Sequence, residues 1–322
     1  KWSEPAWVKQ AGIDPSLFWD DDGICYFVST GSEEPAKDGP GIYLCEIDPF
    51  TGEMLSHSRR ISSGCGGRCA EAPHVYKKDG WYYLMLAEGG TEYGHMITYA
   101  KSDSVWGPFE NYPDNPVLTN RNKAPYIIQG VGHGDLIQDK YGDWHVICLG
   151  FRQIHIWRAY HILGREVFMA PVTFCEDGWF TVGNDGTMDA SYEIKGDFLQ
   201  TPKEKYNFEN TNWNAEWCYL RHPALENYEL LENKAILHGT DITLDQVASP
   251  TFLGIRQRDF NMTLEVSVSI DDGEAGITVY SCENEHYEVA VRKEGEEYEA
   301  LLRLNIGGIK QVQKVKKLPA HR

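Results

Sequence analysis

The stretch Lys77-Lys78-Asp79-Gly80-Trp81-Tyr82-Tyr83-Leu84-Met85-Leu86 predicts the fold class, because a tight turn leads directly into an aromatic and aliphatic strand. Asp and Gly tolerate the positive φ angles of short hairpin turns. Two other segments repeat this order of turn and strand, at a spacing of roughly 60 residues. They are Asp20-Asp21-Asp22-Gly23-Ile24-Cys25-Tyr26-Phe27-Val28 and Asp139-Lys140-Tyr141-Gly142-Asp143-Trp144-His145-Val146-Ile147-Cys148.

Each turn is preceded by a shorter apolar segment that begins with polar residues. The three segments are Asp14-Pro15-Ser16-Leu17-Phe18, Glu71-Ala72-Pro73-His74-Val75-Tyr76 and Gly132-His133-Gly134-Asp135-Leu136-Ile137. A radial arrangement of such antiparallel sheets is a β-propeller, in which the innermost strand of every blade faces the central channel. The polar residues that start these strands are therefore expected to converge at one mouth of the channel.

The pattern changes near residue 190. We predict a propeller domain over residues 1–195, a polar linker over residues 196–205 and a second domain over residues 206–322. Four segments of the second domain alternate apolar and polar residues, which is typical of a β-sandwich. They are residues 252–255, 262–268, 275–280 and 287–291.

Composition restricts the partners. The net charge of -18 argues against nucleic acid and anionic membrane surfaces, which both require clustered Lys and Arg. No segment reaches the roughly 18 apolar residues needed to span a bilayer. The 8 Cys lack zinc-site spacing and are predicted to be free thiols, which indicates a reducing, cytoplasmic location. A neutral substrate fits this composition best.

Four residues are candidates for chemistry. Glu71 lies in an apolar strand, where a carboxylate is costly unless it has a role or a partner. Asp14 has a similar setting, with an Asx-type turn cap as the alternative. His133 lies between two glycines and could be a buried histidine, a metal ligand or a substrate contact. For Arg165, the alternative is a surface ion pair with Glu166.

Four motifs, in this order and spacing, resemble those of glycoside hydrolase family 43. They are Gly12-Ile13-Asp14-Pro15-Ser16-Leu17-Phe18, Ala70-Glu71-Ala72-Pro73-His74-Val75-Tyr76, Gly132-His133-Gly134-Asp135-Leu136 and Leu163-Gly164-Arg165-Glu166-Val167-Phe168-Met169-Ala170-Pro171-Val172. The resemblance covers about residues 1–190. The segment Ser249-Pro250-Thr251-Phe252-Leu253-Gly254-Ile255-Arg256-Gln257 is similar to the accessory domain of the β-xylosidase branch.

The resemblance implies a five-bladed propeller and an inverting mechanism with three carboxylates. Carried over, Glu71 is the general acid and Asp14 the carboxylate that modulates the pKa of that acid. Arg165 and Phe151 would bind substrate. His133 would bind substrate or, on the propeller axis, calcium, although no cofactor is required. Residues 152–161 would line the mouth of the pocket.

The chain departs from the family pattern near its start. The general base of the family lies in an Asp-Pro-Ser motif about a hundred or more residues before the modulator motif, yet only 13 residues precede Asp14. The separation of 57 positions between Asp14 and Glu71 fits the modulator rather than the base. We therefore expect the first blade or two, and the base, to be absent from this chain. We also expect the accessory sandwich to be incomplete, with another segment or chain completing the propeller.

Three functions are compatible with this interpretation. The first is release of terminal xylose or arabinofuranose from xylo- or arabino-oligosaccharides of plant hemicellulose. The second is an endo-arabinanase of the same family. The third is a sugar-binding propeller without catalysis.

Overall fold

The computed structural model describes residues 3–31, 39–124, 126–197, 206, 208 and 216–319. The chain divides into two compact units, Lys1–Phe198 and Leu199–Arg322. Most of the predicted linker, residues 198–205, lies outside the described residues. Among the described residues, no helix is long and apolar enough to cross a membrane.

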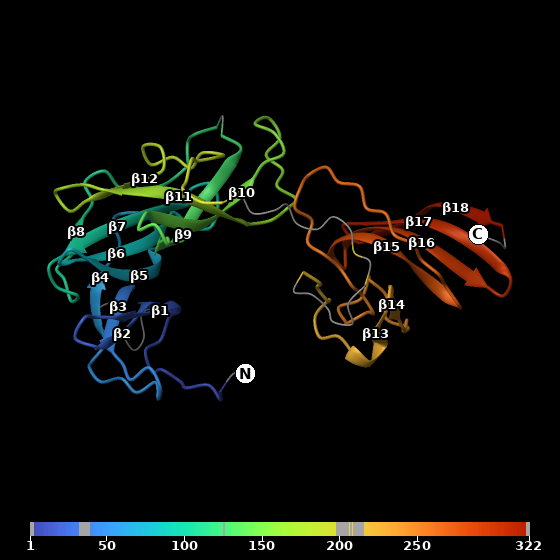
Figure 1. The fold of residues 1–322 in the computed structure, drawn as a ribbon, viewed down its shortest axis with the longest axis horizontal. Helices are drawn as coiled ribbons and strands as arrows, with labels where there is room; N and C mark the ends of the chain where they lie inside the picture. Colours follow the sequence, from blue (N-terminus) through green and yellow to red (C-terminus); the bar gives the residue numbers. More distant parts are fainter. Residues whose placement is uncertain are drawn as a thin grey trace. The chain divides into compact units, whose positions relative to one another are not determined.

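The first unit contains three four-stranded antiparallel sheets, each built from strands that are consecutive in the chain (Figure 1). The first sheet is formed by β1 (Ile13–Trp19), β2 (Cys25–Gly31), β3 (Gly41–Glu46) and β4 (Arg59–Ser62). The second is formed by β5 (Glu71–Lys78), β6 (Trp81–Glu88), β7 (Met96–Ser102) and β8 (Glu110–Asn111). The third is formed by β9 (Ile128–Gln138), β10 (Trp144–Arg152), β11 (Glu166–Phe174) and β12 (Phe180–Val182).

The three predicted hairpins are confirmed as β1–β2, β5–β6 and β9–β10. In the second, Asp79 and Gly80 have φ angles of 52° and 85°, so both central residues of the turn adopt the left-handed region that a two-residue hairpin requires. The turn closes on the pair Lys78 and Trp81. The polar and the aromatic segment of each repeat are therefore neighbouring strands of one sheet.

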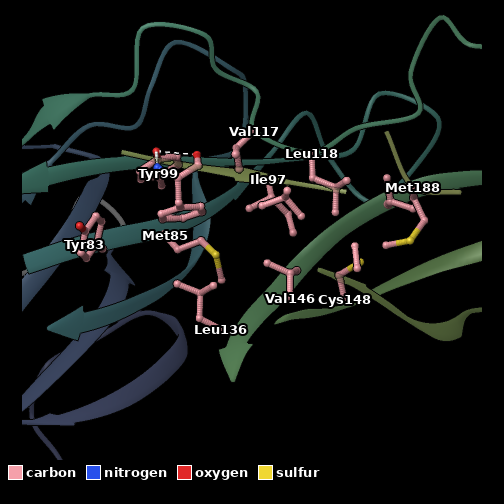
Figure 2. Close-up of a cluster of buried hydrophobic side chains, with 14 of the residues drawn as sticks. Tyr83, Met85, Ile97, Tyr99, Val117, Leu118, Leu136, Val146, Cys148 and Met188 are labelled. Atoms are coloured by element: carbon pink, nitrogen blue, oxygen red, sulfur yellow. Dashed lines mark hydrogen bonds between the residues drawn. The ribbon is translucent and has the colours of Figure 1, made fainter. Parts of the chain in front are cut away.

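The central sheet is buried on both faces, which explains why β6 is apolar at consecutive positions rather than at alternate ones. Leu84 and Leu86 pack in a cluster with side chains of the first sheet. Tyr83 and Met85, on the opposite face, join a cluster with side chains of the third sheet (Figure 2). The two clusters stack the sheets in chain order, as successive blades of a propeller.

The outer face of each terminal sheet is apolar and exposed. On β1, Leu17 and Trp19 are 44% and 55% exposed, and on β11 Val167 is 76% exposed. An apolar cavity of about 230 Å³ beside β1 is lined by Pro15 and Leu17 among others and contains no titratable side chain. The described residues of the first unit form no further sheet that could cover these faces.

The second unit contains a hairpin and a larger antiparallel sheet. The hairpin follows a short 3-10 helix, η1 (Leu225–Asn227), and pairs β13 (Tyr228–Leu231) with β14 (Lys234–Leu237). The sheet is formed by β15 (Gly273–Cys282), β16 (Glu285–Glu294), β17 (Glu297–Ile306) and β18 (Ile309–Leu318).

Two of the four strands predicted for this unit are wrong. Residues 262–268 form no strand, and residues 252–255 contribute only an isolated bridge between Cys218 and Gly254. The alternating side chains Met262, Leu264 and Val266 are all exposed. Alternation gives a strand its two faces, but a strand also needs a neighbour that satisfies its backbone groups, and residues 262–268 have none among the described residues.

Candidate active site

The innermost strands β1, β5 and β9 share an unusual backbone feature, one residue with a positive φ angle inside the strand. Asp14, Ala72 and His133 have φ angles of 51°, 50° and 47°, a region that L-residues other than Gly rarely adopt. On β1 and β5 the register shifts at this point, between Ile13 and Ser16 and between Glu71 and His74. Bulges of this kind redirect side chains at the rims of sheets.

The bulge places Asp14 beside Glu71. The Ala72 N–H donates a hydrogen bond to Asp14 Oδ2 at 3.1 Å, and Ala72 directly follows Glu71 in β5. Two residues later in β1, the Ser16 hydroxyl donates to the Pro73 carbonyl at 2.7 Å. Asp14 is thus held by the neighbouring blade rather than by its own turn, so the Asx-type cap is not formed. Two predicted site residues 57 positions apart in sequence are brought together.

In the same way, β5 contacts β9 through His74, which lies at the position in β5 that Ser16 occupies in β1. His74 Nδ1 lies 3.0 Å from Asp135 Oδ1, and the Tyr76 hydroxyl donates to the same oxygen at 3.1 Å. That hydroxyl also accepts the Leu136 N–H at 2.9 Å. The hydrogen bond with His74 is the main cause that lowers the pKa of Asp135 below its usual value. Each inner strand is therefore fastened to the next by polar contacts beside the bulge.

A cavity of about 420 Å³ opens at the end of the blades where β5 and β9 begin. It is lined by loop residues between β6 and β7, by a residue near the start of β9, and by residues of β10 and of the β10–β11 connection. The lining residues are Thr91, Glu92, Tyr93, Gly130, Leu149, Phe151, His161 and Arg165. Phe151 and Arg165, both predicted to bind substrate, therefore meet in one cavity, which is of ordinary size for a small ligand.

Aromatic rings build one wall of this cavity. The Phe151 ring stacks on His161 at 4.3 Å and meets the edge of Tyr93 at 5.2 Å. The Tyr93 hydroxyl accepts a hydrogen bond from Gln153 Nε2 at 2.7 Å. Because Phe151 is only 6% exposed, its ring supports the wall and is not an open platform for a sugar.

Arg165 does not pair with Glu166. Arg152 binds Glu166 instead through two nitrogens, with Nε at 2.9 Å from Oε2 and Nη2 at 2.7 Å from Oε1. This bidentate geometry is the strongest that a carboxylate can accept from a guanidinium. Arg165 has no hydrogen bond or ion pair with any residue that the structure describes, and it lines the cavity. Its donors are available for a ligand with several hydroxyl groups.

His95 lies against a residue of the cavity lining, Gly130. It is fully buried, and its Nδ1 lies 3.1 Å from the Gly130 carbonyl oxygen. Burial is the main cause that lowers the pKa of His95, and the positive charge of Arg165 lowers it further. A neutral His95 donates from Nδ1 to the wall of the cavity.

Metal binding at His133 stays a prediction. In the described part of the chain, no group of three or more His, Cys, Asp or Glu side chains is placed to hold a metal ion. Calcium prefers oxygen ligands, and a histidine nitrogen without grouped carboxylates does not fit it. We assign no catalytic step to calcium.

Sequence reasoning missed the β6–β7 loop. Thr91, Glu92 and Tyr93 line the cavity, and they follow the pair Gly89-Gly90, whose φ angles are 88° and 79°. A double glycine after a buried strand was a usable signal for a tight turn at the rim. Of the segment predicted to line the pocket mouth, residues 152–161, only His161 lines the cavity. Trp157 and Tyr160 are 85% and 66% exposed.

Two family models match the chain. The model of glycosyl hydrolases family 43 matches residues 1–180. The model of the beta xylosidase C-terminal Concanavalin A-like domain matches residues 205–322. The all-β prediction of propeller blades followed by a second β domain is thereby confirmed, with the sandwich specified as Concanavalin A-like.

Two similar proteins agree with these family models. A non-reducing end alpha-L-arabinofuranosidase of Bacteroides ovatus is 36% identical over 99% of this chain and 60% of its own length. A xylosidase/arabinosidase of Butyrivibrio fibrisolvens is 33% identical over 91% of this chain and 60% of its own. The chain therefore spans about 60% of the length of these relatives.

Solved structures give the same result. The Bacteroides ovatus Xyloglucan PUL GH43B structure is 34% identical, with a TM-score of 0.84 over 99% of this chain and 64% of the other. The xylan beta-1,4-xylosidase of Bacillus halodurans is 29% identical, with a TM-score of 0.80 over 99% of this chain and 63% of the other.

Proposed function

This chain belongs to glycosyl hydrolase family 43, and we propose that its full-length protein releases terminal xylose or arabinofuranose from xylan-type or arabinose-containing oligosaccharides. Glu71 is the general acid that protonates the departing glycosidic oxygen. Asp14 is the second carboxylate, which modulates and orients that acid. We assign no general base within the 322 residues and expect the full-length protein to supply it.

One observation carries the proposal. The hydrogen bond from the Ala72 N–H to Asp14 Oδ2 holds the Asp14 carboxyl group of the first blade against the backbone that directly follows Glu71 in the second blade. Glu71 is the first residue of β5, at the end of the blades where the cavity opens. A paired carboxyl group at the rim of a sugar-sized cavity is the arrangement that glycoside hydrolysis needs.

The cavity favours release of single sugars over cleavage within a chain. Its volume of about 420 Å³ lies near the lower limit of ligand sites, and the aromatic wall of Phe151 and His161 closes one side. Arg165 offers several donors to adjacent ring hydroxyls. The named relatives, a xylosidase/arabinosidase among them, act on sugars of this class.

The test uses the full-length protein with an aryl β-xyloside and an aryl α-L-arabinofuranoside. We expect pentose release from at least one of them, with inversion at the anomeric carbon when the fresh product is followed by proton NMR. A retained anomer contradicts the inverting mechanism. Activity on a disaccharide that is undiminished in Glu71→Gln contradicts the acid assignment.

Two alternatives have distinct outcomes in the same assay. Cleavage of long arabinan with no action on either aryl pentoside indicates an endo-arabinanase. Saturable sugar binding without release of pentose indicates a non-catalytic propeller.

A further inference from the structure

A fully buried carboxylate lies directly behind the proposed acid. Glu88 is the last residue of β6 and has no exposed surface. The preceding residue, Ala87, is the cross-strand partner of Glu71 in the β5–β6 register. Glu88 therefore lies opposite the point at which the chain enters β5.

The partners of Glu88 belong to the segment that leads to Glu71, which we call the 63–70 loop. The Cys65 N–H donates to Glu88 Oε1 at 2.5 Å, and the Gly67 N–H donates to Oε2 at 2.6 Å. Both oxygens of one buried side chain thus accept backbone donors of the same loop. Two backbone N–H donors of one loop therefore converge on a single buried carboxyl group.

The glycines of the loop make room for this carboxylate. A Cβ on Gly67 would meet Glu88 Oε2 at 2.3 Å, and a Cβ on Gly64 would meet Oε1 at 2.7 Å. Beyond these two contacts, the Gly89 N–H donates to the Arg68 carbonyl at 2.8 Å, only three residues before Glu71. The 63–70 loop is thus held from its middle to its end by residues at the end of β6.

We propose that Glu88 is a positioning residue for the glycosidase reaction, which fixes the 63–70 loop and thereby the rotation of Glu71 toward the departing oxygen. This inference rests on the proposed role of Glu71 as general acid. A general acid acts only when its proton is within hydrogen-bond reach of the leaving group, so small displacements at the entry to β5 reduce catalysis.

The variant Glu88→Gln tests the proposal with little change of shape. Its amide NH₂ would face a backbone N–H donor, so one of the two contacts becomes donor against donor. The control is Glu110→Gln, which neutralises an exposed carboxylate on β8 at the outer edge of the same sheet. Thermal unfolding checks that each variant folds.

The decisive measurement is the dependence of the rate on the leaving group. The dinitrophenolate of a 2,4-dinitrophenyl pentoside departs without protonation. The sugar leaving group of a disaccharide departs only when the general acid protonates it. For Glu88→Gln we expect kcat on the disaccharide to fall about tenfold or more, with less than about threefold change on the dinitrophenyl pentoside. Glu110→Gln should change neither. Equal losses on both substrates, or no loss on either, overturn the proposal.

Two further variants keep the outcomes distinguishable. Glu71→Gln should show the same leaving-group dependence in stronger form; its absence there overturns the acid assignment together with this inference. If Glu71→Gln shows the leaving-group dependence and Glu88→Gln does not, only the proposed role of Glu88 is overturned. Should Glu88→Gln not fold, Gly67→Ala displaces the same carboxylate from the loop side, and an equal loss on both substrates there overturns the proposal.

Discussion

The inner strands β1 and β5 have the same backbone and different chemistry. Asp14 and Ala72 occupy equivalent positions with φ angles of 51° and 50°, and each is followed by a proline. The preceding residue is Ile13 in β1 but Glu71 in β5. The same backbone conformation directs a side chain of each strand toward the next blade. The residue type at each position then determines whether the contact only stabilises the fold or can also take part in catalysis.

The third inner strand extends the comparison to packing. Three residues after the positive-φ position, the side chain points to the preceding sheet. Val75 and Leu136 are buried there, at 5% and 6% exposure, whereas Leu17 is 44% exposed. The three equivalent positions therefore contribute differently to the free energy of unfolding, because only two of them have a described sheet to pack against.

The largest expected effect comes from removing the acidic side chain that distinguishes β5 from β1. Glu71→Gln should lower kcat on a disaccharide by about 10²- to 10⁴-fold, because the variant cannot donate the proton. Asp14→Asn should have a smaller effect, about tenfold. The double variant should lose less than the product of the two, since the residues act as a unit. Fully multiplicative losses in steady-state kinetics would show that they act independently.

The next effect concerns stability and uses two leucines at equivalent positions. Leu136→Ala should lower the free energy of unfolding by about 2–5 kcal/mol, because it leaves a cavity between two sheets. Leu17→Ala should lower it by less than about 1 kcal/mol, because the side chain is already partly in water. Urea unfolding of the 322-residue chain measures both. Similar losses for the two variants would contradict the difference in packing.

A smaller effect is expected at the fastening between β1 and β5. Ser16→Ala removes the hydroxyl that donates to the Pro73 carbonyl and should cost about 1 kcal/mol. Ser3→Ala is the control, because its hydroxyl bonds only to the carbonyl of the next residue, Glu4, at an exposed site. Urea unfolding of the two variants compares them, and an equal cost for both would assign no role to the contact between the blades.

The smallest effect is the pH dependence of the fastening between β5 and β9. The pKa of Asp135 is lowered in the folded state, so its contribution is complete above the unfolded value of about 3.9 and is lost as pH falls through the folded value. Asp135 is more than half exposed, so solvent screens the pair with His74 and the effect should stay below about 1 kcal/mol. Asp135→Asn should reduce the loss of thermal stability between about pH 5 and pH 3. An unchanged pH slope would contradict this contribution.

Local sequence predicted the hairpins because the turn residues and the strand pattern are neighbours in the chain. Asp79-Gly80 supplies the required backbone angles, and the apolar run after it can only be buried as a strand. The same reasoning failed for residues 262–268, where the pattern is correct but the described part of the chain contains no partner strand. Pairing is a property of two segments, so alternation in one of them does not establish it.

The sequence by itself determined the repeated blades, the all-β class and the candidate acid Glu71, since each depends on residues close together in the chain. The tertiary structure alone decided that Asp14 bonds beside Glu71, that Glu166 pairs with Arg152 and leaves Arg165 to the cavity, and that Tyr93 and His161 share its wall. These contacts join residues of different strands or loops that are distant in the chain. They depend on how the sheets stack and where each bulge falls, which short-range patterns do not encode.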